Sequence, residues 1–266
     1  MQRLLHPRTI AVVGANDRPG SYSGETLLNL ARLGYPGTVW GVNPGRAEAH
    51  GVPCFPSLSD LPEPPDAVVV AIPAAGVAAV VEEAGAIGCG GAVVYGAGFG
   101  EIAQGRALES ELAEAARRHG LPLCGPNGNG IVALHDRLAL WGDALRPLEP
   151  GRVALVSQSG NVARVFTATR RGLRLHTVIS CGNSAALDPA DWIAQLAGED
   201  GVGSIAVYLE ADGHGSRLCE ALAACADRGV GVSLLKVGVS PRPRPRGSAI
   251  SCRTPPLWAT RSTTPP

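Results

Sequence analysis

Long apolar runs and paired cysteines are both missing from the 266-residue sequence. No stretch reaches the roughly 18 apolar residues that a membrane-spanning helix needs, and the first residues lack the apolar core of a secretion signal. The seven cysteines are odd in number, scattered along the chain and without a C-x-x-C pair. We therefore expect reduced thiols in a cytoplasmic protein, with no membrane contact, no disulfide framework and no metal site.

An excess of charge is lacking as well, since 23 basic residues balance 23 acidic ones. This neutral total argues against a nucleic-acid-binding protein. Residues 239–266, however, carry five arginines, no acid and seven of the 22 prolines. Without those arginines, 18 basic residues face 23 acidic ones in residues 1–238, a net charge of −5. We expect a disordered tail at 239–266, and favour an unfolded end over a basic arm for RNA or a membrane surface.

Apolar residues are plentiful, at 45% of the chain, and recur in short runs that alternate with helical patterns. This content can fill the cores of two modest domains or one large one, and it excludes disorder over most of the chain. The run at 66–72 has no polar alternation, which is typical of parallel strands covered on both faces. The first series predicts strands at 9–13, 39–42, 66–72, 91–95 and 121–124, with helices at 23–33, 77–87 and 105–119.

A second series of the same kind begins near Gly151. It predicts strands at 153–156, 175–180, 204–209 and 230–236, with helices at 161–171, 188–197 and 216–228. Such alternation predicts an α/β fold with doubly wound sheets and right-handed crossovers. The connection at 143–151 carries two prolines. We therefore expect two domains, at 1–143 and 144–238, followed by the tail at 239–266.

The first predicted strand ends in a glycine-rich turn that leads into a helix. Glycine at positions 14, 20 and 24 lets the backbone approach a ligand, and unpaired amides at a helix N-terminus attract phosphate. A plain tight turn fits the glycines equally well. Asn16 stands where a G-x-G-x-x-G loop has its second glycine, and Asn43 ends the second strand where NAD sites place an acid. Both asparagines disfavour an NAD-dependent oxidoreductase.

Other predicted strands of the first series end in similar loops. An apolar lip at 71–75 follows the third strand, a Gly-rich turn at 96–100 follows the fourth, and the segment 124–130 comes after the fifth. The segment 124–130 also fits a flexible crossover turn. Ligands of open α/β sheets bind at the carboxyl edge, where such loops meet. The convergence of the four strand ends at 14–24, 41–44, 71–75 and 96–100 favours a nucleotide-bearing ligand over coincidental turns.

Two segments of the second series also carry polar groups at strand ends. Residues 157–161 lead from a strand into a helix, which predicts an anion site, although Ser159 fits an ordinary N-cap equally well. The pattern is not the G-x-S-x-G of a nucleophile elbow. Glu210 ends a buried strand, where its carboxylate suits either a bound cation or plain solvation.

These segments follow one another in a set order along residues 1–238. They are Gly14-Ala15-Asn16 with Pro19-Gly20, Val42-Asn43-Pro44, Ala71-Ile72-Pro73, Gly98-Phe99, Gly125-Pro126-Asn127, Ser157-Gln158-Ser159-Gly160, Gly182-Asn183, Tyr208-Leu209-Glu210 and Leu235-Lys236-Val237-Gly238. The ordered set resembles the NDP-forming (ADP-forming) acyl-CoA synthetases, which are relatives of the succinyl-CoA synthetase alpha subunit. The resemblance implies a Rossmann-like CoA-binding domain followed by a flavodoxin-like, succinyl-CoA-synthetase-like domain.

The resemblance also implies roles for individual residues. A phosphate carried on a histidine would lie on the helix start formed by Ser157, Gln158, Ser159, Gly160 and Asn161, with Glu210 supporting the histidine. Coenzyme A would be held by Gly14, Asn16, Pro19, Gly20, Ser23, Asn43, Pro44, Ile72, Pro73, Gly98, Phe99, Pro126 and Asn127. The Pro126–Asn127 pair would lie near the thiol end. The implied reaction converts a carboxylate, CoA and an NTP into acyl-CoA, an NDP and phosphate through an acyl phosphate and a phosphohistidine.

The sequence departs from the family at three places. Gly128 replaces a cysteine, Ala186 replaces an aspartate, and residues 253–261 contain no histidine where the family has its phosphate carrier. One set of codons for Arg-Thr-Pro-Pro-Leu-Trp-Ala-Thr, read two bases later, encodes His-Thr-Ala-Ala-Leu-Gly-Asp. We hypothesise a frameshift, which sequencing the gene would test. His214 follows Glu210 on a Gly-flanked loop. We favour a plain surface loop there over a role for His214 as the phosphate carrier.

Two functions remain for the chain. It is either the CoA-binding portion of an acid–thiol ligase, inactive alone, or a stand-alone regulatory module that binds CoA or a nucleotide. The ligase would need an ATP-grasp (beta-type) subunit to bind ATP or ADP and Mg²⁺. The sequence does not identify the carboxylic acid that is activated, which could be acetate, a longer acyl group or an aryl acid. It also leaves open whether the chain forms a homo-oligomer.

Overall fold

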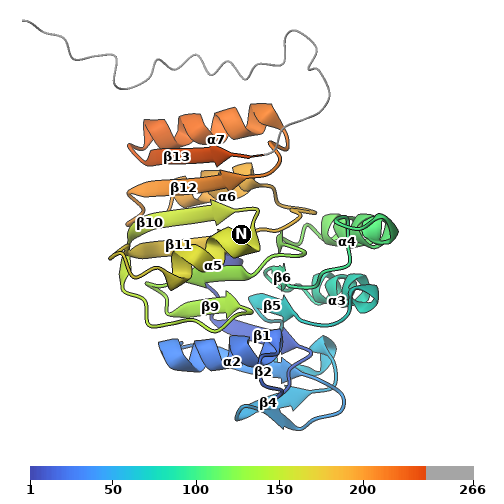
Figure 1. Cartoon of the computed structure of the whole chain (residues 1–266). Coiled ribbons are helices and arrows are strands. Elements are labelled where there is room, and N and C mark those ends of the chain that lie inside the picture. Colours follow the sequence, from blue (N-terminus) through green and yellow to red (C-terminus); the bar gives the residue numbers. More distant parts are fainter. Residues whose placement is uncertain (238–266) are drawn as a thin grey trace, which may run out of the picture.

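Two β-sheets lie one above the other in the computed structural model, which describes residues 1–237 (Figure 1). The predictions for the tail at 239–266 and for the histidine segment lie outside the described residues. Parallel strands dominate both sheets, and helices lie beside them. The predicted α/β class, with a Rossmann-like sheet followed by a flavodoxin-like one, is confirmed.

The first sheet has seven strands in the order β3-β4-β2-β1-β5-β6-β7. They are β1 (Thr9–Val13), β2 (Thr38–Val42), β3 (Glu48–Ala49), β4 (Val52–Phe55), β5 (Ala67–Val70), β6 (Ala92–Val94) and β7 (Leu123–Cys124). All neighbours are parallel except β3 and β4. Because β1 pairs with β2 on one side and with β5 on the other, the strand order reverses at β1, and a ligand crevice is expected at its carboxyl end.

The helices of this part connect the strands and begin at recognisable residues. They are α1 (Gln2–Leu5), α2 (Tyr22–Leu33), α3 (Ala74–Ala86) and α4 (Arg106–Arg118), with single 3₁₀ turns η1 (Leu58–Asp60) and η2 (Ala103–Gly105). Ser21 caps α2 by accepting a hydrogen bond from the Gly24 amide, and Gly34 ends it in the left-handed conformation. Helix α3 begins directly after Pro73 and runs back along the sheet.

The second sheet has six strands in the order β13-β12-β10-β11-β8-β9. They are β8 (Gly130–Ala133), β9 (Leu138–Trp141), β10 (Pro150–Ser157), β11 (Leu175–Ser180), β12 (Ser204–Leu209) and β13 (Gly231–Lys236), with helices α5 (Gly160–Ala168), α6 (Pro189–Ala197) and α7 (Gly215–Asp227). Strands β10 to β13 are mutually parallel where they pair, whereas β8 is antiparallel to both β11 and β9. The order of parallel strands reverses at β10, which again places a crevice at a carboxyl end.

Strands β8 and β9 were not predicted from the sequence. They precede the predicted domain boundary at residue 144, yet they hydrogen-bond into the second sheet. The hydrogen bonding therefore favours a boundary before Gly130, and the division into domains stays a prediction. The two parts share a core cluster that includes Ile10 and Tyr95 from the first sheet and Ile131 and Val156 from the second.

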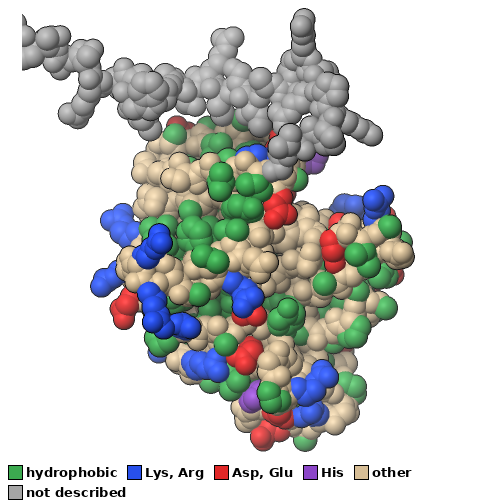
Figure 2. Space-filling model, in the orientation of Figure 1, with side chains coloured by type: hydrophobic (Ala, Val, Ile, Leu, Met, Phe, Trp, Pro, Cys, Tyr) green, Lys and Arg blue, Asp and Glu red, His purple; other side chains and the backbone are tan. Residues whose placement is uncertain are grey.

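The outer edge of the second sheet is apolar and accessible. Leu235 of β13 is 58% exposed and Val165 of α5 is 67% exposed. Figure 2 shows apolar side chains gathered over β12, β13 and α5. Within residues 1–237, no helix is long and apolar enough to cross a membrane.

Candidate functional site

The glycine turn after β1 lies tightly against the end of β5. Gly14 has φ +83°, and a Cβ atom at this position would lie 2.6 Å from the Ala71 carbonyl oxygen. A side chain is therefore excluded on two counts, the left-handed backbone and the neighbouring strand. The turn then opens into the N-terminus of α2, where Gly20 has open space around its Cα.

Asn16 and Ser23, both predicted as CoA ligands, are buried and bind the loop itself. Asn16 Nδ2 donates to the Gly14 carbonyl at 2.9 Å and to Ser23 Oγ at 2.8 Å, while its Oδ1 accepts from the Arg18 amide at 3.0 Å. Ser23 Oγ donates to the same Gly14 carbonyl at 2.8 Å. These side chains shape the loop, which leaves backbone and Arg18 to face a ligand.

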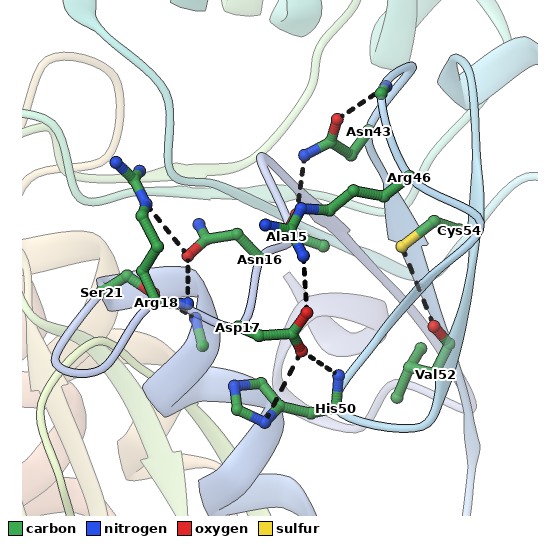
Figure 3. Close-up of polar contacts among 12 residues, drawn as sticks. Ala15, Asn16, Asp17, Arg18, Ser21, Asn43, Arg46, His50, Val52 and Cys54 are labelled. Atoms are coloured by element: carbon green, nitrogen blue, oxygen red, sulfur yellow. Dashed lines mark hydrogen bonds and ion pairs between the residues drawn. The ribbon is translucent and has the colours of Figure 1, made fainter.

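Asn43 ties the loop after β2 to the glycine turn (Figure 3). Its Nδ2 donates to the Ala15 carbonyl at 2.8 Å, and its Oδ1 accepts from the Gly45 amide at 2.9 Å. Next to it, Arg46 forms an ion pair with Asp17 at 2.5 Å. Sequence reasoning assigned neither Arg18 nor Arg46, although their position beside the glycine turn was a usable signal.

Two cavities open at this edge of the first sheet, and Ile72 lines both. The first is about 300 Å³ and is lined by Asn16, Arg18, Gly20, Ser21, Tyr22, Ser23, Ala71, Ile72, Tyr95 and Gly96. The second is about 350 Å³ and is lined by Val13, Gly14, Val42, Asn43, Pro44, Pro56, Ser57, Leu58, Ile72, Val80 and Glu83. Seven of the predicted CoA residues therefore meet at the crevice: Gly14, Asn16, Gly20, Ser23, Asn43, Pro44 and Ile72.

The other predicted CoA residues lie beside the cavities without lining them. Pro19 is exposed in the glycine turn, and Pro73 precedes α3. The Phe99 side chain is fully buried, and the amides of Gly98 and Phe99 donate to the Glu101 carboxylate.

The Pro126–Asn127 pair reaches the first cavity through a backbone contact. Pro126 is buried after a cis peptide bond, and Asn127 is exposed. The Asn127 amide donates to the Gly96 carbonyl at 2.9 Å. Because Gly96 lines the first cavity, this loop, which follows the neighbouring strand β7, abuts the cavity wall.

The predicted phosphate loop after β10 has an uncapped helix start. Ser157 Oγ is buried and exchanges hydrogen bonds with the backbone of Ser159. Ser159 occupies the N-cap position of α5, but its hydroxyl accepts no capping hydrogen bond, so the ordinary N-cap alternative is not what the structure has. The amides of the first turn, at Gly160 and Asn161, have no intrahelical partner and point out of the helix end.

Gln158 joins this loop to the end of β12. Its Oε1 accepts from the amides of Glu210 at 2.7 Å and Ala211 at 2.9 Å. The Glu210 carbonyl accepts from Lys236 Nζ at 3.0 Å, and the Glu210 side chain is exposed. The structure thus brings the predicted phosphate loop and the backbone of Glu210 together, through the Gln158 side chain.

Two further predictions concern His214 as a phosphate carrier and the absence of a metal site. His214 occupies the N-cap position of α7 and is exposed. Within residues 1–237, no group of three or more His, Cys, Asp or Glu side chains is arranged to hold a metal ion.

Known proteins resemble both parts of the chain. Residues 8–133 match the model of a CoA binding domain, and residues 150–252 match that of a succinyl-CoA ligase like flavodoxin domain. The chain is 36% identical over 243 residues to acetate–CoA ligase [ADP-forming] I of Archaeoglobus fulgidus, covering 90% of this chain and 35% of the relative. It is 32% identical over 228 residues to the alpha subunit of acetate–CoA ligase [ADP-forming] I of Pyrococcus furiosus, covering 83% and 49%.

A solved structure agrees with these relatives. The dinucleotide-forming acetyl-coenzyme A synthetase 1 of Ca. Korarchaeum cryptofilum superposes with a TM-score of 0.82 at 31% identity, covering 88% of this chain and 52% of that one. The chain thus spans between about a third and a half of these relatives' lengths. The chain joins a CoA binding domain to a succinyl-CoA-ligase-like flavodoxin domain, and is homologous to the alpha-type regions of ADP-forming acetate–CoA ligases.

Proposed function

We propose that the chain binds coenzyme A in the crevice of the first sheet and acts as the CoA-binding portion of an acyl-CoA synthetase. The reaction would convert a carboxylate, CoA and an NTP into acyl-CoA, an NDP and phosphate. The pair of cavities that meet at Ile72, beside the glycine turn and the N-terminus of α2, carries this proposal. Together they offer a long crevice, as a long ligand with a nucleotide at one end requires.

The charges around the crevice suggest how CoA lies in it. Phosphates belong near Arg18 and the first turn of α2, where a helix N-terminus contributes about 0.3–1 kcal/mol to holding an anion, or ~2 when partly buried. The apolar second cavity, with Val42 and Leu58, suits the adenine ring. The uncharged wall at Tyr95 and Gly96 suits the pantetheine arm, whose thiol end would then approach Asn127.

The second sheet would supply the phosphate-handling part of the reaction. The uncapped start of α5 at Ser159 and Gly160 suits a phosphate group, and Gln158 holds the Glu210 loop beside it. ATP or ADP and Mg²⁺ would be bound by an ATP-grasp partner subunit or domain. Relatives include a separate alpha subunit and longer single-chain ligases, which supports a partner for this chain.

A cytoplasmic location is part of the same proposal. The described thiols of Cys54, Cys89, Cys124, Cys181 and Cys225 are free. Reduced thiols of this kind are usual in the cytoplasm.

Calorimetric titration of the full chain with CoA, NADH and ADP tests the proposal. CoA should bind, whereas NADH should not. Arg18→Ala should weaken CoA binding about three- to tenfold and reduce its salt dependence, because a charged contact to phosphate is lost. Arg228→Ala, at the exposed end of α7, is the matched control and should leave CoA binding unchanged. Failure of the folded protein to bind CoA at millimolar concentration would contradict the proposal.

Adding ATP and an ATP-grasp subunit tests whether the chain is an incomplete ligase portion or a regulatory module at all. CoA binding with neither phosphohistidine nor acyl-CoA formation would agree with both the incomplete ligase portion and a stand-alone CoA-binding regulatory module. Formation of phosphohistidine would contradict both.

A further inference from the structure

The loop after β6 binds two carboxylates of its own chain. Gly98 and Phe99 donate their backbone amides to the Glu101 carboxylate, and the Gly100 amide donates to Glu109 Oε2 at 2.9 Å. Successive amides that converge on one anion form a nest of positive partial charge. Since side chains of the same chain fill this nest, the loop has its shape before any ligand binds.

Asn183, in the loop after β11, connects this nest to the second sheet. Its Nδ2 donates to Glu101 Oε2 at 2.8 Å and to Glu109 Oε2 at 2.7 Å. Its backbone amide donates to the Pro126 carbonyl at 2.9 Å, and its Oδ1 accepts from Asn127 Nδ2 at 3.2 Å. One residue of the loop after β11 therefore contacts three separate segments, and we refer to Asn183, Glu101 and Glu109 as the clamp.

The charge on Glu101 strengthens the clamp. Partial burial opposes ionisation of Glu101, but hydrogen bonds from Asn183 and from the amides of Gly98 and Phe99 outweigh burial and lower its pKa. Hydrogen bonds to an ionised carboxylate are shorter and stronger than those between neutral groups. The carboxamide of Asn183 therefore holds the loop firmly at neutral pH.

The clamp adjoins the wall of the first cavity. Gly96 lines that cavity, and its carbonyl accepts the Asn127 amide. We propose that Asn183 is a positioning residue for the thiol-bearing arm of CoA: by holding the loop at 98–100 and Asn127 together, it fixes the wall along which the arm lies. This inference rests on the proposed CoA site.

Calorimetry on the full chain with two ligands tests the inference. CoA carries the arm, whereas adenosine 3′,5′-bisphosphate carries a phosphorylated nucleoside and no arm. Asn183→Ala should weaken CoA binding about tenfold, because hydrogen bonds to two carboxylates are lost. The same variant should bind the bisphosphate within about twofold of the wild type. Glu101→Gln changes an exposed side chain without altering its size, and should weaken CoA binding about threefold with the bisphosphate unaffected.

The control breaks a different contact between distant parts of the chain. His6 contacts Asp136 and Glu199 and lines neither cavity of the crevice, so His6→Ala should leave both affinities unchanged. If Asn183→Ala lowered the affinities for CoA and for the bisphosphate equally, the variant would have loosened the structure as a whole, and the inference would be overturned. An unchanged affinity for CoA would overturn it as well. A folded wild-type protein that binds neither ligand would overturn the proposed function and the inference together. If the wild type binds CoA and Asn183→Ala binds it with the same affinity, the inference alone is overturned.

Discussion

At the scale of single residues, the polar side chains of the crevice hold loops in place and leave backbone to meet a ligand. Asn16 and Asn43 each use both ends of the carboxamide on neighbouring backbone. In the second sheet, the Oε1 of Gln158 accepts from two backbone amides of the Glu210 loop. An amide side chain suits this task because it donates and accepts at once. The asparagine at position 16 is thus explained by loop geometry.

The tight approach at Gly14 makes it sensitive to the smallest side chain. Gly14→Ala should lower the free energy of unfolding by about 1–2 kcal/mol for the left-handed backbone and by a further ~1–3 kcal/mol for the contact with the Ala71 carbonyl. Gly20→Ala is the matched control, because Gly20 has φ +71° and nothing within 4 Å. Urea unfolding of the two variants measures the difference. Equal losses would contradict the proposed crowding.

The sequence predicted the location of the crevice more fully than the tasks of its residues. Strand ends at 13–14, 42–44 and 71–73 were expected to converge, and all of their residues except Pro73 line the two cavities. Which polar atoms remain available for a ligand could not be predicted, because it depends on loops that lie close only after folding. Asn183 and Glu101 are 82 residues apart, and their hydrogen bond has no sequence spacing that would reveal it.

At the scale of elements, long apolar runs were predicted almost to the residue. The strands at 175–180 and 204–209 match β11 and β12 in both bounds. Strands β3, β4, β8 and β9 were missed, because each has two to four residues and owes its existence to a partner strand. Helix α5 ends at Ala168, three residues earlier than predicted, since Thr169 has an extended backbone.

Helices α5 and α6 begin in opposite ways, which gives a matched comparison. Asp188 accepts from the Ala190 and Asp191 amides in a capping box, whereas the Ser159 hydroxyl makes no capping bond. Asp188→Ala should therefore lower the free energy of unfolding by about 1–2 kcal/mol, and Ser159→Ala by less than about 0.5 kcal/mol. Thermal unfolding of both variants measures this. A loss at Ser159 as large as that at Asp188 would show that its hydroxyl does cap α5.

At the scale of the whole molecule, contacts between segments far apart in sequence join the two sheets. Asn29 of α2 donates to the carbonyls of Trp141 at 3.1 Å and Asp143 at 2.8 Å, and Thr26 Oγ1 donates to the Trp141 carbonyl at 3.2 Å. These bonds place the start of the second sheet against the helix that flanks the proposed phosphate site. The crevice is therefore braced by the second sheet through α2, so changes at Asn29 should reach CoA binding.

His6 makes one of these long-range contacts sensitive to pH. Its Nδ1 lies 2.8 Å from Asp136 and its Nε2 lies 2.9 Å from Glu199. Partial burial opposes protonation, but hydrogen bonds and charge attraction from Glu199 and Asp136 outweigh it, so the pKa of His6 is raised. The protonated ring therefore stabilises the fold fully below the unfolded-state pKa of about 6.5, and this stabilisation is lost as pH rises through the higher folded-state pKa.

Because the His6 ring is 40% exposed, solvent limits the effect to about 0.2–1 kcal/mol. Urea unfolding at pH 6 and pH 9 should show the wild type losing this much more stability than His6→Asn over the same interval. The variant retains a polar side chain but cannot become charged, so it isolates the proton. Identical pH dependence in the two proteins would contradict the predicted stabilisation by the protonated ring.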